Sequence, residues 1–134
     1  MDWTCERSEA PQFIRVIGDG LFSGEGFARM FDDLFALPHW RFGIPLLFDQ
    51  RKIDYSEVTS SQLLTASDVF ISRNDQLAFT RIAVIFETAD LGLAGRFDLI
   101  TKQMSKAMVK ICRGEKEALD WVTPQNPNMP FWNP

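Results

Sequence analysis

Two charged side chains follow an apolar run in the first half of the chain. Asp49 and Arg51 come directly after Ile44–Phe48. If this run is a parallel strand, both residues lie at its carboxyl end, the edge at which open α/β sheets bind their ligands. An exposed carboxylate with a neighbouring cation explains the same pair without any ligand. The pair is therefore a candidate contact site, and the alternative is an exposed ion pair that binds nothing.

A pair of serines, Ser60 and Ser61, lies between Thr59 and Gln62. The latter two residues have the spacing of a capping box, so a helix is predicted to begin here. Such a pair could be a regulatory switch, because the free N–H groups and the positive end of a helix stabilise a negative charge at its start. Thr59 or Ser60 acting only as an N-cap accounts for the same residues without a kinase. Both interpretations stay open.

Side chains that commonly form catalytic or cofactor sites are sparse. His39 is the only histidine, and it lies in a connection between Pro38 and Gly43 with no nucleophile near it in the sequence. A loop histidine beside aromatic residues is more often a packing residue than a general base. Two Gly-x-Gly pairs lack the third glycine and the lysine of phosphate-binding loops. We therefore expect neither an enzyme nor a cofactor.

The sequence predicts neither a metal site nor a disulfide. Asp54, Glu57 and Asp68 could gather around a hard cation, but their spacing matches no calcium-binding loop. Cys5 and Cys112 are far apart and belong to no CxxC or Cys/His pair. In a sheet stacked in sequence order, several strand spacings of about 4.8 Å would separate them, too far for a disulfide. We expect two free thiols.

Length and composition are those of a single domain. Of the 134 residues, 46% are hydrophobic, enough for a core without metal or disulfide. Residues 1–124 form the predicted domain, and residues 125–134 form a Pro/Asn-rich tail. The net charge of −4 suits neither nucleic acid nor an anionic membrane surface. With no secretion signal and no apolar run of spanning length, we expect a cytoplasmic protein with no membrane span.

The hydrophobic pattern alternates between short strands and amphipathic helices. Strands are expected at Trp3–Arg7, Phe13–Gly18, Ile44–Phe48, Arg81–Phe86 and Ala107–Cys112. Helices are expected from Ser23 to before Pro38, from Thr59 toward Leu77, from near Asp90 through Met104, and at Glu115–Val122. Turn residues between the first two strands predict an N-terminal hairpin. The alternation that follows predicts an α/β fold with right-handed crossovers, a mostly parallel sheet and about four helices.

Two of the expected strands raise the question of what covers the second face of the sheet. Ile44–Phe48 and Arg81–Phe86 are apolar on both faces, whereas successive right-handed crossovers place their helices on one face. The hairpin, the tail, a second subunit or an apolar ligand could cover the other. We expect Met129, Phe131 and Trp132 of the tail to dock on this chain or a second copy, with a frayed terminus as the alternative.

Four motifs, taken in order, resemble the SpoIIAA-like (STAS-type) domain family. They are the strand with its Asp-x-Arg end at Ile44–Arg51, the strand Ile82–Phe86, the helix entry Gly92–Phe97 and the closing element Glu117–Val122. The resemblance covers almost everything from Phe13 to Val122. Gly95 departs from the family pattern, which has an arginine or a similar residue in the helix entry. The resemblance implies strands stacked largely in sequence order and no catalytic centre.

The resemblance also implies a function. Bacterial anti-sigma-factor antagonists of this family are protein-binding switches that are phosphorylated on a serine in an Asp-Ser-Ser-Gly element at a helix start. The corresponding segment here is Thr59 to Gln62, which places Ser60 at the acceptor position and replaces the Asp and the Gly. The family therefore implies a non-enzymatic bacterial interaction or regulatory module with a protein partner or self-association. The alternative is a small apolar-ligand or lipid-binding protein, because lipid-carrier domains have a related fold.

The contact surface of such a module is expected at the start of the second long helix and the loop before it. In a right-handed βαβ unit, a strand and the helix that follows it meet at the edge formed by the carboxyl ends of the strands. We therefore expect Asp49, Arg51 and Ser60 to lie near one another at that edge.

Overall fold

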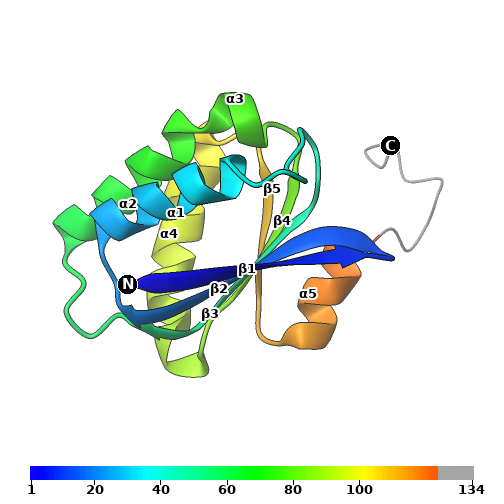
Figure 1. Cartoon of the computed structure of the whole chain (residues 1–134). Helices are drawn as coiled ribbons and strands as arrows, with labels where there is room; N and C mark the ends of the chain where they lie inside the picture. Colours follow the sequence, from blue (N-terminus) through cyan, green and yellow to red (C-terminus); the bar gives the residue numbers. More distant parts are fainter. Residues whose placement is uncertain (124–134) are drawn as a thin grey trace.

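A five-stranded sheet forms the middle of the molecule (Figure 1). The computed structural model describes residues 1–123, without the side chains of Ile100 and Gln103. The strands are β1 Asp2–Glu9, β2 Gln12–Leu21, β3 Leu46–Asp54, β4 Arg81–Ile85 and β5 Met108–Cys112. They lie side by side in sequence order, with β1 antiparallel to β2 and every other neighbouring pair parallel. The predicted hairpin, parallel sheet and strand order are confirmed.

Helices lie on both sides of this sheet (Figure 1). They are α1 Gly24–Phe35, α2 Ser60–Ser72, α3 Asn74–Leu77, α4 Leu91–Met104 and α5 Glu115–Val122, with a short 3-10 turn, η1, at Thr88–Asp90. In Figure 1, α1, α2 and α4 gather on one side, and α5 lies on the other. Ala118 and Val122 of α5 are fully buried and pack with Leu47, Ala83 and Ile85. Helix α5 therefore covers part of the second face of the sheet. It was not among the candidates expected to do so.

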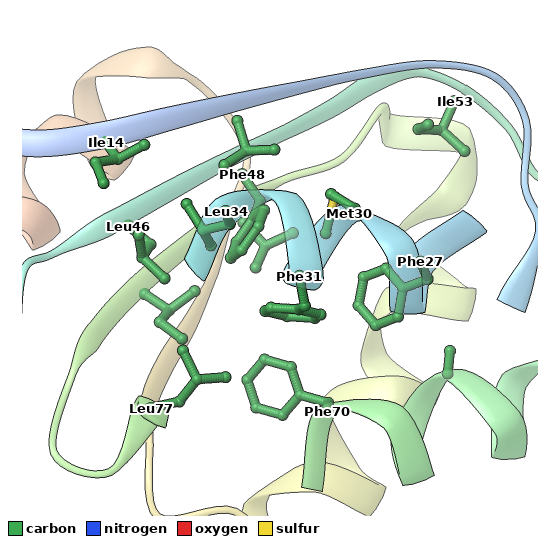
Figure 2. Packing of buried hydrophobic residues seen from close by; sticks show 14 of the residues in the cluster. Ile14, Phe27, Met30, Phe31, Leu34, Leu46, Phe48, Ile53, Phe70 and Leu77 are labelled. Carbon is green, nitrogen blue, oxygen red and sulfur yellow. The ribbon is translucent and has the colours of Figure 1, made fainter. Parts of the chain in front are cut away.

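The larger core lies between the sheet and α1, α2 and α4. Ser23 caps α1, because its side-chain oxygen accepts a hydrogen bond from the N–H of Gly26 at 3.0 Å. The apolar stripe predicted for this helix faces the sheet, and Phe31 is fully buried at its centre. Its ring makes edge contacts with the rings of Phe27, Phe48 and Phe70 (Figure 2).

Strand β3 is longer than predicted, which changes the place of two candidate residues. It runs from Leu46 to Asp54 instead of ending at Phe48. Backbone pairing with β2 continues up to Leu21 and Asp54, beyond a shift in register. Asp49 and Arg51 therefore lie within the strand, and the expectation that they mark its carboxyl end is wrong.

The helix expected from Thr59 toward Leu77 is divided into α2 and α3. The division lies at Arg73, which ends α2 and precedes α3. Asn74 ties α3 to a distant segment. Its side-chain amide donates to the carbonyl of Met104 at 3.1 Å and accepts from the N–H of Lys106 at 3.1 Å. Helical periodicity does not predict these two hydrogen bonds, because they join residues that are distant in the sequence.

The two cysteines lie in opposite edge strands, Cys5 in β1 and Cys112 in β5. Four strand spacings of about 4.8 Å separate the two strands, more than a disulfide can bridge. Burial raises the pKa of Cys112 to about 11, so this thiol is not a reactive thiolate at neutral pH. Met129, Phe131 and Trp132 lie outside the described residues, and their docking stays a prediction.

Candidate functional site

Asp49 and Arg51 belong to a group of four charged side chains on the α5 side of the sheet. The group, hereafter the charge cluster, consists of Arg15, Asp49, Arg51 and Glu115. Arg51 donates to both carboxylate oxygens of Asp49, with Nε at 2.9 Å and Nη2 at 2.7 Å. Arg15 holds both oxygens of Glu115, at 2.5 and 2.9 Å, and Arg51 Nη2 adds a third bond to Glu115 at 3.1 Å. The charge cluster links β2, β3 and the start of α5.

The charge cluster is electrically balanced, with two cations and two carboxylates. Hydrogen bonding from Arg51 holds the pKa of Asp49 below its usual value, and hydrogen bonding from Arg15 does the same for the pKa of Glu115. The pKa of Arg51 is raised in turn, chiefly by its bond to Asp49. Because each member has an oppositely charged partner within the cluster, these residues fix α5 on the sheet.

The start of α2 has the capping box predicted from the sequence. The hydroxyl of Thr59 accepts from the N–H of Gln62 at 3.1 Å, and the side-chain oxygen of Gln62 accepts from the N–H of Thr59 at 3.1 Å. Thr59, and not Ser60, is therefore the N-cap. Ser60 and Ser61 are both exposed, and Ser60 Oγ accepts from Nη2 of Arg96 in α4 at 3.3 Å.

The structure does not bring Ser60 together with Asp49 and Arg51. Alternate side chains of a strand point to opposite faces, and Asp49 shares its face with Leu47, which packs against α5. The start of α2, with Ser60 and its partner Arg96, belongs to the helices on the other side (Figure 1). The expectation that the three residues form one surface is wrong.

A cavity opens on the side of the sheet that α1, α2 and α4 cover, near the carboxyl ends of the parallel strands. It contains about 490 Å³ of empty space, counted out to its open mouth. The centre of a water-sized sphere can move within about 50 Å³ of it. Twelve residues line this aromatic cavity: Phe22, Phe27, Phe48, Gln50, Tyr55, Val58, Leu63, Ala66, Val84, Phe86, Leu93 and Phe97. The sequence reasoning missed this site, although the carboxyl edge is where α/β sheets bind ligands.

Gln50 and Tyr55 are the polar side chains in this wall. Gln50 is 6% exposed, and its side-chain oxygen accepts a hydrogen bond from the hydroxyl of Tyr55. The amide nitrogen of Gln50 has no hydrogen-bond partner among residues 1–123, and it is not fully enclosed by the protein. Burial raises the pKa of Tyr55, and the nearby carboxylate of Asp90 raises it further, so the phenol stays neutral. The cavity thus holds an amide donor that the protein does not satisfy.

Three carboxylates, hereafter the acidic rim, stand beside the cavity at the ends of β3 and β4. Asp54 precedes Tyr55 in the chain, and Glu87 and Asp90 follow Phe86. Burial raises the pKa of Asp90, and the charges of Glu87 and Asp54 raise it further. The three acids are therefore close enough to repel one another. An anion that approaches from this side meets the same repulsion.

His39 and the acidic side chains are the other candidates for chemistry in the described chain. His39 lines an open polar hollow with Arg7, Pro38, Trp40 and Arg41, and no serine or cysteine lines it within residues 1–123. In the same range, no group of three or more His, Cys, Asp or Glu side chains is arranged to hold a metal ion. None of the described helices is long and apolar enough to cross a membrane.

Comparison with solved structures identifies the architecture. The chain is similar to a crystal structure of an uncharacterised DUF3478-family protein from Shewanella loihica PV-4, described as having a SpoIIAA-like fold. The likeness covers 90% of this chain and 92% of that one, with a TM-score of 0.59. The fold is SpoIIAA-like. At 18% identity, the likeness shows the SpoIIAA-like fold alone. No protein-family model and no curated protein matches the sequence.

Proposed function

We propose that this protein is a non-enzymatic regulatory module whose contact surface lies at the start of α2, with Ser60 as its control point. One observation carries the proposal: the exposed hydroxyl of Ser60 lies at the first position of a 13-residue helix and faces the guanidinium of Arg96. The module would bind a protein partner or a second copy of itself, and we place it in the cytoplasm.

The capping box strengthens this proposal. Because Thr59 already serves as the N-cap, the hydroxyl of Ser60 has no capping role. The first N–H groups of a helix have no partner within it, and the helix end carries a partial positive charge. A phosphate on Ser60 would gain from both features and from a charge-assisted hydrogen bond to Arg96. Ser61 is also exposed, but no hydrogen bond joins its side chain to another residue of the described chain.

The direct test is to make the protein with phosphoserine installed at position 60, and a matched control with phosphoserine at position 61. The phosphate on Ser60 should raise the midpoint of thermal unfolding, and Arg96→Gln should remove most of the gain, equivalent to about 1 kcal/mol. The phosphate on Ser61 should be insensitive to Arg96→Gln. Equal sensitivity at both positions would contradict a site built around Ser60.

A second experiment tests the switch in its biological setting. The protein is incubated with ATP and an extract of its own cells, and phosphate is located by mass spectrometry. We expect phosphate on Ser60, and a partner captured by the unmodified protein but not by the phosphorylated form. Persistent absence of phosphate from both serines would count against the regulatory role.

We propose the binding of a small apolar ligand as the second candidate function. The aromatic cavity favours it, since ligand pockets are mostly apolar with a few polar groups that set orientation. The two functions need not exclude each other, because Val58 and Leu63 of the cavity wall flank the start of α2. Retention of an apolar small molecule through native purification would support this function.

A further inference from the structure

We infer that the aromatic cavity selects a small uncharged ring compound that carries one hydrogen-bond acceptor, such as a carbonyl oxygen, and discriminates against carboxylates of the same size. The inference rests on the second function proposed above, the binding of a small apolar ligand. It adds the charge, size and polarity of that ligand, which the cavity walls define.

The walls favour a flat ring. Tyr55 stands at the centre of an aromatic group, with its ring 5.4 Å from that of Phe22 and 5.6 Å from that of Phe86. The rings of Phe27 and Phe97, which also line the cavity, meet edge to face at 6.4 Å. Aromatic rings prefer offset or edge-to-face contacts with one another, and this wall offers both. The small free volume suits one ring with a short substituent.

Gln50 favours a ligand that carries a hydrogen-bond acceptor. Its oxygen is taken by the hydroxyl of Tyr55, which leaves the two N–H donors of its amide for a ligand. A donor in the wall of an apolar cavity gains a hydrogen bond when a ligand brings an acceptor to it. The acceptor should strengthen binding about tenfold relative to a ligand of the same shape without one.

The acidic rim favours a neutral ligand over a negatively charged one. Asp54 adjoins Tyr55 in the chain, and Glu87 and Asp90 follow Phe86, so these three carboxylates stand beside the cavity wall. A bound carboxylate would lose its hydration in an apolar site and would also face these negative charges. A neutral carbonyl compound meets neither obstacle, so it should bind in preference to the matching acid.

Three probes of one size separate these effects: acetophenone is neutral with an acceptor, ethylbenzene is neutral without one, and benzoate is an anion. Their dissociation constants for the intact protein would be measured by calorimetry at neutral pH. We expect acetophenone to bind at one site, about tenfold more tightly than ethylbenzene and at least tenfold more tightly than benzoate. In Gln50→Met, acetophenone and ethylbenzene should bind equally, whereas Asp90→Asn should improve the binding of benzoate.

Each outcome bears on a different statement. If ethylbenzene binds the unaltered protein as tightly as acetophenone, the role of Gln50 is wrong, although ligand binding stands. If benzoate binds as well as acetophenone, the role of the acidic rim is wrong. If none of the three binds, both the inference and the ligand-binding function fail. The ratios among probes in the unaltered protein decide the matter even if Gln50→Met does not fold.

Discussion

The two faces of the sheet differ in whether their polar side chains have partners within the protein. On the α5 face, the four members of the charge cluster are only partly buried, and each has an oppositely charged partner within the cluster. On the other face, Gln50 is buried, yet its amide donors have no partner within residues 1–123. Polar groups that are paired within the protein stabilise the structure, whereas a donor left unpaired in the wall of a cavity is available to a ligand. We infer from this difference that the charge cluster supports the structure, and that the proposed ligand would bind on the other face.

The largest expected effect comes from adding volume on each face. Ala83 is fully buried against α5, and Ala66 is buried in the wall of the cavity. Ala83→Leu should lower the free energy of unfolding by about 1–3 kcal/mol, because no space exists for the added carbons. Ala66→Leu should cost much less, since its side chain enters empty space, and it should abolish binding of acetophenone. Chemical denaturation of both variants measures the difference, and equal losses would show that the cavity is not open in solution.

The next effect concerns the charge cluster. Asp49→Asn should lower the free energy of unfolding by about 1–2 kcal/mol at neutral pH, because Arg51 loses a doubly hydrogen-bonded partner that is shielded from water. The control is Glu117→Gln, which breaks the exposed ion pair with Lys110 at 3.8 Å and should change stability by less than about 0.5 kcal/mol. Asp49→Asn should leave the affinity for acetophenone unchanged. A loss of affinity would place the cluster in the binding site.

The pH dependence of stability should follow the same cluster. The pKa values of Asp49 and Glu115 are lowered by folding, so both contribute stability at pH values above their unfolded pKa of about 4. That contribution is lost as the pH falls through the lower pKa values of the folded state. Urea denaturation from pH 6 to pH 2 should therefore show a smaller acid loss in Asp49→Asn than in the unaltered protein. Parallel curves for the two proteins would contradict the shift assigned to Asp49.

The smallest expected effect belongs to the acidic rim. The pKa of Asp90 is raised by folding, so the ionised form of this side chain destabilises the folded state above its pKa. Asp90→Asn should stabilise the protein at neutral pH by less than about 0.5 kcal/mol, because this position is partly open to solvent. The gain should shrink as the pH falls and Asp90 becomes protonated in the unaltered protein. A loss of stability at neutral pH would mean that the carboxylate has a favourable partner.

The fold could be predicted from local patterns because its elements are strongly periodic. Ser23 and Thr59 cap α1 and α2 as their spacing suggests, and the apolar run Ile82–Ile85 belongs to the fully buried strand β4. The limits of prediction lie where distant residues decide. β3 extends to Asp54 because β2 pairs with it, and α3 separates from α2 where Asn74 bonds to the segment after α4.

The candidate site was harder to predict than the fold. Asp49 and Arg51 were found as a pair, but their partners Arg15 and Glu115 come from elements remote in the sequence. The cavity is formed by residues from five elements and three connections, so no short motif encodes it. One signal was present: Gln50 follows Leu46 and Phe48 at alternating positions of a strand, which places an amide on the apolar face.

The central claim is that ligands bind on the face covered by α1, α2 and α4, and that the charge cluster only supports the structure. The most direct test is an NMR measurement of nuclear Overhauser effects between acetophenone and the carbon-13-labelled protein. Contacts should appear from the ligand to Val84, Leu63 and Leu93, which line the cavity. Contacts to Leu119 or Val122 of α5, or binding without contacts to the cavity, would contradict the account.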